Sequence, residues 1–493
     1  MPTMSSAGDF QDSETSRVPI QRVAVIGAGF SGVVSAAHLI KEGFKVTVYE
    51  RTGRIGGVWY YDKQVDRDPP FPNLVPPAQN WRDVEAEGLS KEEALILHGP
   101  PGTCYAGLKN NVPTSLMKSC LLPWPEGTEE FIDQGRIVQY LQDIARLHGV
   151  TENVQFYTRV ESVTKPAGNT QWIVKTSTLQ AEGDAFSVSR RSESFDRVVV
   201  ASGHYHIPFV PDTRGLSAWK ARFAGRVIHS KKYRTPEPFR GKTILLVGAG
   251  ASALDIAREV CAVGGKVIQS RRESKYDLTG PRLPEEVERV AMVAEFLAKE
   301  TDTSISRWTE QGSAAIPGQV VLEDGTVLEN IDYVVIATGY ITSYPFLEDL
   351  EQPHVAWEDA DERVVITADG YTTHNLHKDI FYIPDPTLAF IGVSALVSTF
   401  SLFDFQAKVL AKVFAGHVKL PGDSVMKREQ RERKARFQPG DRFHALIGRE
   451  QEYIAEVLTW VNASLTQVDK PPMEGMDAKW RVAYDNFHAN RGP

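Results

Sequence analysis

Short apolar runs rich in β-branched residues alternate with helical patterns along this chain. Val23–Ile26 has the length of a buried strand, Val33–Lys41 follows as a helical pattern, and Lys45–Tyr49 forms a second run. Gly43 stands where the helical pattern ends, as helix C-termini favour. Two short apolar runs joined by a helix are typical of parallel strands in a βαβ unit. The chain is therefore predicted to open with an α/β unit.

The same order of elements recurs in the middle of the chain. Thr243–Val247, Ser252–Val263 and Lys266–Ile268 have the patterns of a strand, a helix and a strand. Two further strand patterns that end in small residues, Arg197–Ala201 and Tyr333–Gly339, bracket this second unit. We therefore predict an α/β fold with two Rossmann-like dinucleotide-binding domains, the second inserted into the first.

The predicted boundaries follow from this bracketing. A disordered polar lead occupies residues 1–19, the first domain spans 20–203, the inserted domain spans 204–340, and residues 341–493 return to the first domain and add C-terminal helices. The other predicted elements are helices at Lys91–Leu97, Gln134–His148, Pro284–Lys299, Phe403–Phe414, Lys427–Arg436 and Gln451–Ala463, strands at Val154–Tyr157, Val160–Val163, Trp172–Thr176 and Thr387–Val393, and a hairpin at Gln319–Leu328.

The turn after the first strand carries a nucleotide-binding pattern. It reads Gly27-Ala28-Gly29-Phe30-Ser31-Gly32, which is G-x-G-x-x-G, and the second strand ends at Glu50. The three glycines allow a tight turn, a close approach of the backbone to a pyrophosphate, and close packing of helix on strand. An acid at the end of the second strand accepts hydrogen bonds from a ribose diol and disfavours a 2′-phosphate. FAD or NAD is therefore expected here.

The second unit carries a related turn with different specificity residues. Gly248-Ala249-Gly250-Ala251-Ser252-Ala253 spells G-x-G-x-x-A, and Arg271-Arg272 follow the next strand in place of the acid. A guanidinium forms charge-assisted bonds with phosphate. This site is therefore expected to bind the 2′-phosphate of NADPH. One chain then holds FAD and NADPH, a layout that brings a hydride donor to a flavin.

Three other segments are candidates for cofactor contacts, and each has a structural alternative. Gly56-Gly57 allows a second close approach of backbone to ligand, or is a plain turn. Asn110-Asn111 offers amide donors and acceptors to a flavin edge or a nicotinamide, or forms an Asn-rich turn before a proline. His229 contacts the cofactors or acts as an acid, or is a buried structural histidine.

Composition narrows the class of protein. A net charge of −8 disfavours a nucleic-acid partner. Only three cysteines occur, without a C-x-x-C pair. This disfavours a structural metal site and a dithiol reductase, and it favours a reducing compartment such as the cytoplasm.

No apolar run reaches the roughly 18 residues of a membrane span, so no membrane anchor is expected. The oligomeric state stays open, with a homo-oligomer as one option.

Taken together, these motifs resemble the class B flavin-containing monooxygenase family, over roughly residues Arg22–Trp460. The resemblance is carried by the two fingerprints, by Gly56-Gly57-Val58-Trp59, by Leu108–Pro113 against L-x-T-N-x-P, by Phe223, Gly225, His229 and Tyr233 against F-x-G-x-x-x-H-x-x-x-[YF], and by Ala337-Thr338-Gly339-Tyr340. The related Baeyer–Villiger enzymes usually end the F-x-G motif in Trp, so Tyr233 favours heteroatom oxidation. Without an apolar anchor, the chain resembles the family's microbial or fungal members.

The resemblance implies roles for individual residues. Asn111 falls on the active-site asparagine, beside flavin and nicotinamide. Asn110 stands where the family usually has Thr or Ser. The other expected cofactor contacts are Val58 and Trp59 for the flavin, and Ser252 and Asp255 beside the NADP pyrophosphate. Val112, His229, Ala253 and Gln406 are also expected to contact a cofactor.

The resemblance also implies a reaction. NADPH reduces FAD, O₂ forms a C4a-(hydro)peroxyflavin in a dry pocket, and an amine nitrogen or a sulfide sulfur of a small molecule takes the distal oxygen. Three alternatives stay open: Baeyer–Villiger oxidation of a ketone, an NADPH oxidase that releases H₂O₂, and a non-catalytic nucleotide sensor. The sequence does not identify the substrate.

Overall fold

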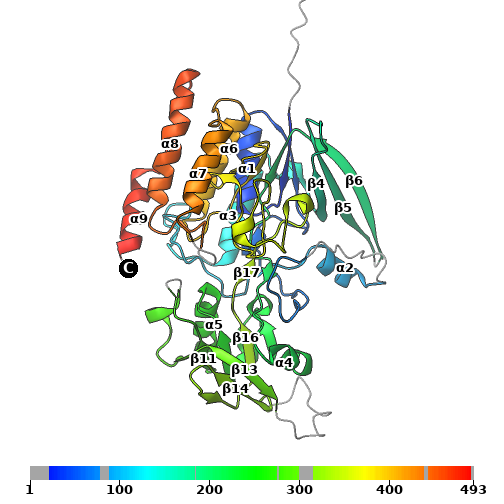
Figure 1. The fold of residues 1–493 in the computed structure, drawn as a ribbon, viewed down its shortest axis with the longest axis vertical. Helices are drawn as coiled ribbons and strands as arrows, with labels where there is room; N and C mark the ends of the chain where they lie inside the picture. The colour runs from blue at the N-terminus through cyan, green and yellow to red at the C-terminus, as the bar shows by residue number, and fades with distance from the viewer. Residues whose placement is uncertain are drawn as a thin grey trace, which may run out of the picture.

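The computed structural model describes residues 21–77, 88–183, 185–274, 277–298, 315–437 and 442–489. The predicted lead at residues 1–19 lies outside them. Two main sheets dominate the fold, and Figure 1 shows them in two parts of the molecule, one above the other.

The larger sheet has seven strands and contains the first predicted βαβ unit. β1 lies at its centre, pairs in parallel with β2 and β7, and is followed by α1 (Phe30–Lys41). Val23 to Val25 are fully buried, because a parallel sheet is covered on both faces. In sheet order the strands are β18 (Leu376–His377), β19 (Phe381–Tyr382), β20 (Leu388–Phe390), β7 (Arg197–Val200), β1 (Arg22–Ile26), β2 (Lys45–Tyr49) and β3 (Val154–Gln155).

The second sheet is built entirely from residues between β7 and β20. Its central strand β10 pairs in parallel with β11 and β16, and α5 (Ala251–Ala262) follows β10. The fold with two dinucleotide-binding units, one nested in the other, is thereby confirmed. In sheet order the strands are β12 (Glu288–Val290), β11 (Lys266–Ser270), β10 (Thr243–Val247), β16 (Tyr333–Ile336) and β9 (Val227–His229).

The chain crosses between the two parts twice, and the crossings lie side by side. β8 (Ile207–Pro208) leads into the nested unit and β17 (Tyr340–Ile341) leads out of it. The two strands pair antiparallel, with Tyr340 opposite Pro208. This pairing fixes the place where the two nucleotide-binding units meet.

The predicted helix at Pro284–Lys299 is wrong where the structure describes it. β12 joins the second sheet there, and β13 (Val293–Ala298) pairs antiparallel with β14 (Gly318–Leu322). A bulge between Val293 and Glu295 shifts the register, so that Val293 and Phe296 both face the core. Buried positions three residues apart imitate a helical period. The predicted hairpin at Gln319–Leu328 is confirmed, with β15 (Val327–Leu328) as its second strand.

A three-stranded antiparallel sheet flanks the larger sheet. It consists of β4 (Thr158–Thr164), β5 (Trp172–Glu182) and β6 (Ala185–Phe195). The β5–β6 ribbon is much longer than the strand predicted at Trp172–Thr176. In its outer half Leu179, Phe186 and Val188 form a small apolar face that packs against α2 (Lys91–His98), and the remaining positions are mostly polar.

Helices cover the larger sheet. α6 packs along α1, and His38 Nε2 and Asp404 Oδ1 join the two helices at 2.8 Å. No helix within the described residues is long and apolar enough to cross a membrane. The remaining α-helices are α2 (Lys91–His98), α3 (Gln134–Leu147), α4 (Leu216–Arg222), α6 (Phe400–Phe414), α7 (Asp423–Lys434), α8 (Glu450–Gln467) and α9 (Ala478–Ala489), and Figure 1 shows α6 to α9 together on one side.

We predict that Trp480→Ala lowers the midpoint of thermal unfolding. Trp480 in α9 is fully buried, stacks on Tyr484 and donates from Nε1 to Leu116 O at 3.1 Å. Removing a buried indole costs about 3–5 kcal/mol. Val482→Ala on the exposed face of the same helix is the control. An unchanged midpoint in the Trp480 variant would show that α9 adds no stability.

Candidate functional site

A cavity of about 1700 Å³ lies where the two nucleotide-binding units meet. Ordinary small-molecule pockets measure roughly 300–1000 Å³, so this cavity has room for two large ligands. Fifteen of the predicted site residues line it: Gly27, Gly29, Phe30, Ser31, Glu50, Gly57, Val58, Trp59, Asn111, Val112, Gly248, Gly250, Ser252, Asp255 and Arg271.

Main-chain packing at the first fingerprint leaves no room for side chains. A Cβ added to Gly32 would lie 1.8 Å from Gly27 O, and one added to Gly57 would lie 2.8 Å from the Cα of Gly29. Gly32 therefore packs helix on strand beneath the cavity rather than lining it. Gly57 brings the Gly-Gly turn against the fingerprint, and Gly56 N–H donates to Ala28 O at 3.2 Å. No side chain caps the N-terminus of α1, so its first N–H groups stay available to a phosphate.

Glu50 is held in one orientation at the end of β2. Its Oε2 accepts from the N–H of Ala28 at 2.9 Å, and its Oε1 accepts from the N–H and hydroxyl of Thr52 at 2.9 and 2.8 Å. The side chain is mostly buried but lines the cavity. The carboxylate is thus fixed between the fingerprint and the second strand, where a ribose diol would be bound.

The second fingerprint repeats this arrangement. Gly248 has φ +127°, and a Cβ there would lie 2.3 Å from Ala337 O, whereas the space beside Gly250 is open. No side chain caps α5. Ala253 is fully buried and packs α5 on the sheet, so it does not line the cavity. This cradle fits a second pyrophosphate.

Asp255 in α5 connects the second cradle to the first domain. Its carboxylate accepts a hydrogen bond from the Tyr105 hydroxyl. Burial raises the pKa of Asp255, and the tyrosine hydrogen bond opposes that shift. The segment that leads from Tyr105 to Asn111 is thereby tied to the helix of the nested unit.

Arg271 reaches the cavity from the end of β11, and so does Arg272. Arg271 forms an ion pair with Asp277, with Nε and Oδ2 3.8 Å apart. Asp277 also pairs with Arg289. Lys231 is buried and donates to Asp66, and Arg234 donates to the carbonyls of Gln64 and Gly102, so neither is placed for a 2′-phosphate.

The two neighbouring asparagines have different positions. Asn111 lines the cavity, whereas Asn110 is buried and satisfied by three hydrogen bonds. Asn110 Nδ2 donates to Val112 O and to Glu130 O, both at 2.7 Å, and its Oδ1 accepts from the N–H of Ile132 at 2.6 Å. The amide of Asn110 therefore fixes the turn that presents Asn111, and its expected cofactor contact stays a prediction.

His229 and Tyr233 of the F-x-G motif lie in the protein core rather than at the cavity. His229 is fully buried, its Nδ1 accepts from the N–H of Lys231 at 3.1 Å, and burial lowers its pKa to about 3. Tyr233 donates to Glu259. His229 is thus a buried, neutral histidine outside the cavity lining, and its contact with the cofactors stays a prediction.

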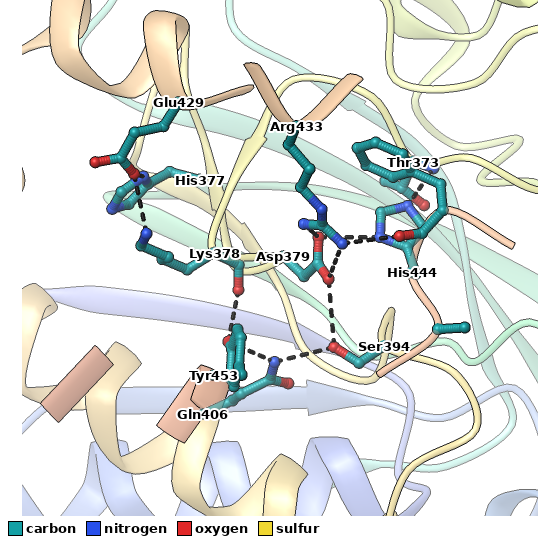
Figure 2. Close-up of polar contacts among 12 residues, drawn as sticks. Thr373, His377, Lys378, Asp379, Ser394, Gln406, Glu429, Arg433, His444 and Tyr453 are labelled. Carbon is teal, nitrogen blue, oxygen red and sulfur yellow. Dashed lines mark hydrogen bonds and ion pairs between the residues drawn. The ribbon is translucent and has the colours of Figure 1, made fainter. Parts of the chain in front are cut away.

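Gln406 also lies away from the cavity, in a buried polar network that Figure 2 shows. Its Nε2 donates to Tyr453 Oη at 2.9 Å and to Ser394 Oγ at 3.3 Å. Gln406 is not among the residues that line the cavity, so its expected contact with FAD stays a prediction. It supports Ser394, which precedes the cavity-lining residues Ala395 to Phe400.

The sequence analysis missed the turn before α6. Phe400 lines the cavity and stacks on Phe30, with ring centroids 3.8 Å apart. A Cβ on Gly392 would lie 2.6 Å from Ser31 Oγ, so the returning strand approaches the first fingerprint closely. A glycine directly after an apolar run, here Gly392, was the sequence feature that could have indicated this close approach. The turn itself has no recognisable sequence pattern.

These features fit two dinucleotides bound in one cavity. The acid of the first unit and the arginines of the second fit FAD and NADPH respectively. Glu50, Trp59 and Val58 belong to the first position, and Ser252, Asp255 and Arg271 to the second.

Comparison with known proteins agrees with this geometry. The flavin-binding monooxygenase-like family model matches residues 100–313 and 313–468, and an NAD(P)-binding Rossmann-like domain matches residues 25–84. The flavin-containing monooxygenase ustF2 of Aspergillus flavus is 38% identical over 489 residues, covering 94% of this chain and 96% of that protein.

Two further similar proteins have more specific names. The senecionine N-oxygenase of Tyria jacobaeae is 29% identical, over 86% of this chain and 76% of its own. The S-allyl-L-cysteine S-oxygenase of Allium sativum has the same fold, with a TM-score of 0.69 at 24% identity over 96% of this chain and 93% of its own. The chain therefore belongs to the flavin-binding monooxygenase-like family, and its cofactors are FAD and NADPH.

Proposed function

We propose that this protein is an NADPH- and O₂-dependent monooxygenase that oxygenates the nitrogen or sulfur of a small molecule. The observation that carries the proposal is one continuous cavity lined by both fingerprints and by Asn111. A hydride donor and a flavin held in one cavity can react directly. The names of the N-oxygenase and S-oxygenase among the similar proteins support a soft nucleophile as the substrate.

FAD, when bound, accepts the hydride and supplies the reactivity toward O₂. The chain's own residues hold the cofactors and exclude water. Asn111 provides amide hydrogen bonds at the cavity wall, and an amide neither gains nor loses a proton near neutral pH. Phe30, Phe400 and Trp59 provide apolar surface around the same region. The amide and these apolar side chains supply no acidic proton, and proton donors beside the flavin would promote the wasteful release of H₂O₂.

Matched oxygen acceptors test the proposal. The purified holoenzyme is given NADPH, O₂ and, in separate reactions, a tertiary amine, an aryl methyl sulfide and a cyclic ketone. We expect the N-oxide or the sulfoxide to form in proportion to the NADPH consumed, with no ester from the ketone. An ester as the main product would establish Baeyer–Villiger chemistry, and H₂O₂ alone with every acceptor would indicate an oxidase.

We predict that Asn111→Ala retains FAD and the unfolding midpoint but releases more H₂O₂ per NADPH. The side chain lines the cavity, so its loss affects the reaction rather than the core. Asn110→Ala is the matched variant, and it is expected to lower the midpoint, because each buried group left unpaired costs about 1–3 kcal/mol. Unchanged coupling of oxygenation to NADPH use in the Asn111 variant would remove its assigned role.

We predict that Arg271→Ala raises the KM for NADPH and leaves the KM for NADH unchanged. A lost hydrogen bond to a charged group costs about 1.5–3 kcal/mol, or roughly tenfold to 100-fold in KM. Lys266→Ala is the control, because Lys266 lies at the other end of β11 and does not line the cavity. Equal effects on both nucleotides would place the 2′-phosphate elsewhere, with Arg272 as the next residue to test.

A further inference from the structure

Two buried carboxylates hold opposite ends of the cavity-lining segment that precedes α6. Asp379 Oδ2 contacts Ser394 Oγ at 3.5 Å, at the end of the segment seen in Figure 2. At the other end, Glu450 Oε1 accepts from the N–H of Ser398 at 2.7 Å, and its Oε2 accepts from the Ser398 hydroxyl at 2.6 Å. Glu450 is the first residue of α8, is 2% exposed, and lines the cavity.

The electrostatic surroundings of the two carboxylates are opposite. Asp379 is paired with Arg433 at 2.6 and 3.1 Å and with His444 at 2.9 Å, and these partners hold its pKa far below the usual range. The Glu450 carboxylate accepts its hydrogen bonds from Ser398, and burial raises its pKa to about 7. The pKa values of the two acids that contact this segment thus lie far apart. Asp379 stays ionised, and Glu450 can bind a proton near neutral pH.

The groups packed around Glu450 do not neutralise it. α9 contributes Tyr484, whose hydroxyl accepts from the Glu450 N–H at 3.3 Å, and Asp485. On its own helix Glu452 is exposed, and the preceding Arg449 is exposed and donates to Ala445 O. The segment 394–399 carries no charged residue. Burial and the hydrogen bonds from Ser398 set the pKa of Glu450. Arg442, His444 and His488 line the same cavity.

Ser398 connects this carboxyl to the start of α6. It lies between Leu396 and Thr399, whose φ angles of +53° and +36° are unusual for residues with side chains. The Thr399 hydroxyl oxygen is buried without a hydrogen-bond partner, and no side chain caps α6. Leu396 to Phe400 all line the cavity. The Glu450–Ser398 contact therefore fixes a strained turn whose polar groups face the cofactor cavity.

We propose that Glu450 is a proton-binding positioning residue that takes up a proton when negative charge develops in the cavity on reduction of the flavin. This inference rests on FAD binding and on reduction by NADPH. The hydride brings two electrons and one proton to the flavin. The Glu450 carboxylate then binds one further proton, which comes from water. The negative charge of the reduced flavin and that of Glu450 therefore do not coexist in the same cavity. Ser398 keeps its hydrogen bonds to the carboxyl oxygens in both states.

The pH dependence of the flavin midpoint potential tests this assignment. The potential of bound FAD is titrated between about pH 5 and pH 9 in the wild type and in Glu450→Gln. Proton uptake begins at the pKa of Glu450 in the oxidised protein and ends at its higher pKa in the reduced protein. We expect the wild-type potential to fall more steeply with pH across that window than the Glu450→Gln potential does.

Two more variants keep the test decisive. Glu452→Gln makes the same chemical change on the exposed surface of α8 and should follow the wild type. Ser398→Ala removes one hydrogen bond to the carboxylate and should move the steep region of the potential curve to higher pH. This variant provides the test if Glu450→Gln does not fold. Identical curves for wild type and Glu450→Gln, or an unmoved window in Ser398→Ala, would overturn the proposal. The midpoint potential can be measured without forming an oxygenated product. A failure of the proposed monooxygenase activity would therefore be distinguished from a failure of this proposal.

Discussion

The site depends on a main-chain contact that excludes even a single methyl group. At the first fingerprint Gly32 lies directly against Gly27 O, and Gly57 lies against Gly29. These contacts bring β1, α1 and the Gly-Gly turn together and leave the N-terminal N–H groups of α1 facing the cavity. Gly248 repeats the arrangement beside Ala337 in the nested unit. Two such cradles open onto one cavity because the paired strands β8 and β17 join the sheets beside it.

Buried polar groups around the cavity act mainly on the segments that line it. Asn110 fixes the turn of Asn111, Tyr105 ties that segment to α5, and Gln406 supports Ser394. None of these three contacts requires a ligand. In the proposed reaction the chemistry is then carried out by the cofactors and by the few side chains that line the cavity.

The sequence predicted the parts of the structure whose residues interact locally. Both βαβ units follow from glycine spacing and apolar runs, because these features act within about thirty residues. The helix predicted at Pro284–Lys299 was wrong because a bulge at Val293 hid the strand period, and that register depends on β14. Which asparagine faces the cavity, and where Gln406 points, depend on residues distant in sequence such as Ile132 and Tyr453. The F-x-G motif identified the family although Tyr233 packs in the core.

The origin of the transferred oxygen tests the central claim most directly. The holoenzyme would turn over an aryl methyl sulfide with NADPH under ¹⁸O₂ in ordinary water, and the sulfoxide would be analysed by mass spectrometry. The account predicts that each sulfoxide carries one oxygen atom from O₂, with catalase present so that free H₂O₂ cannot form it. Sulfoxide that disappears when catalase is added would contradict direct oxygen transfer in the cavity and would leave the protein as an oxidase.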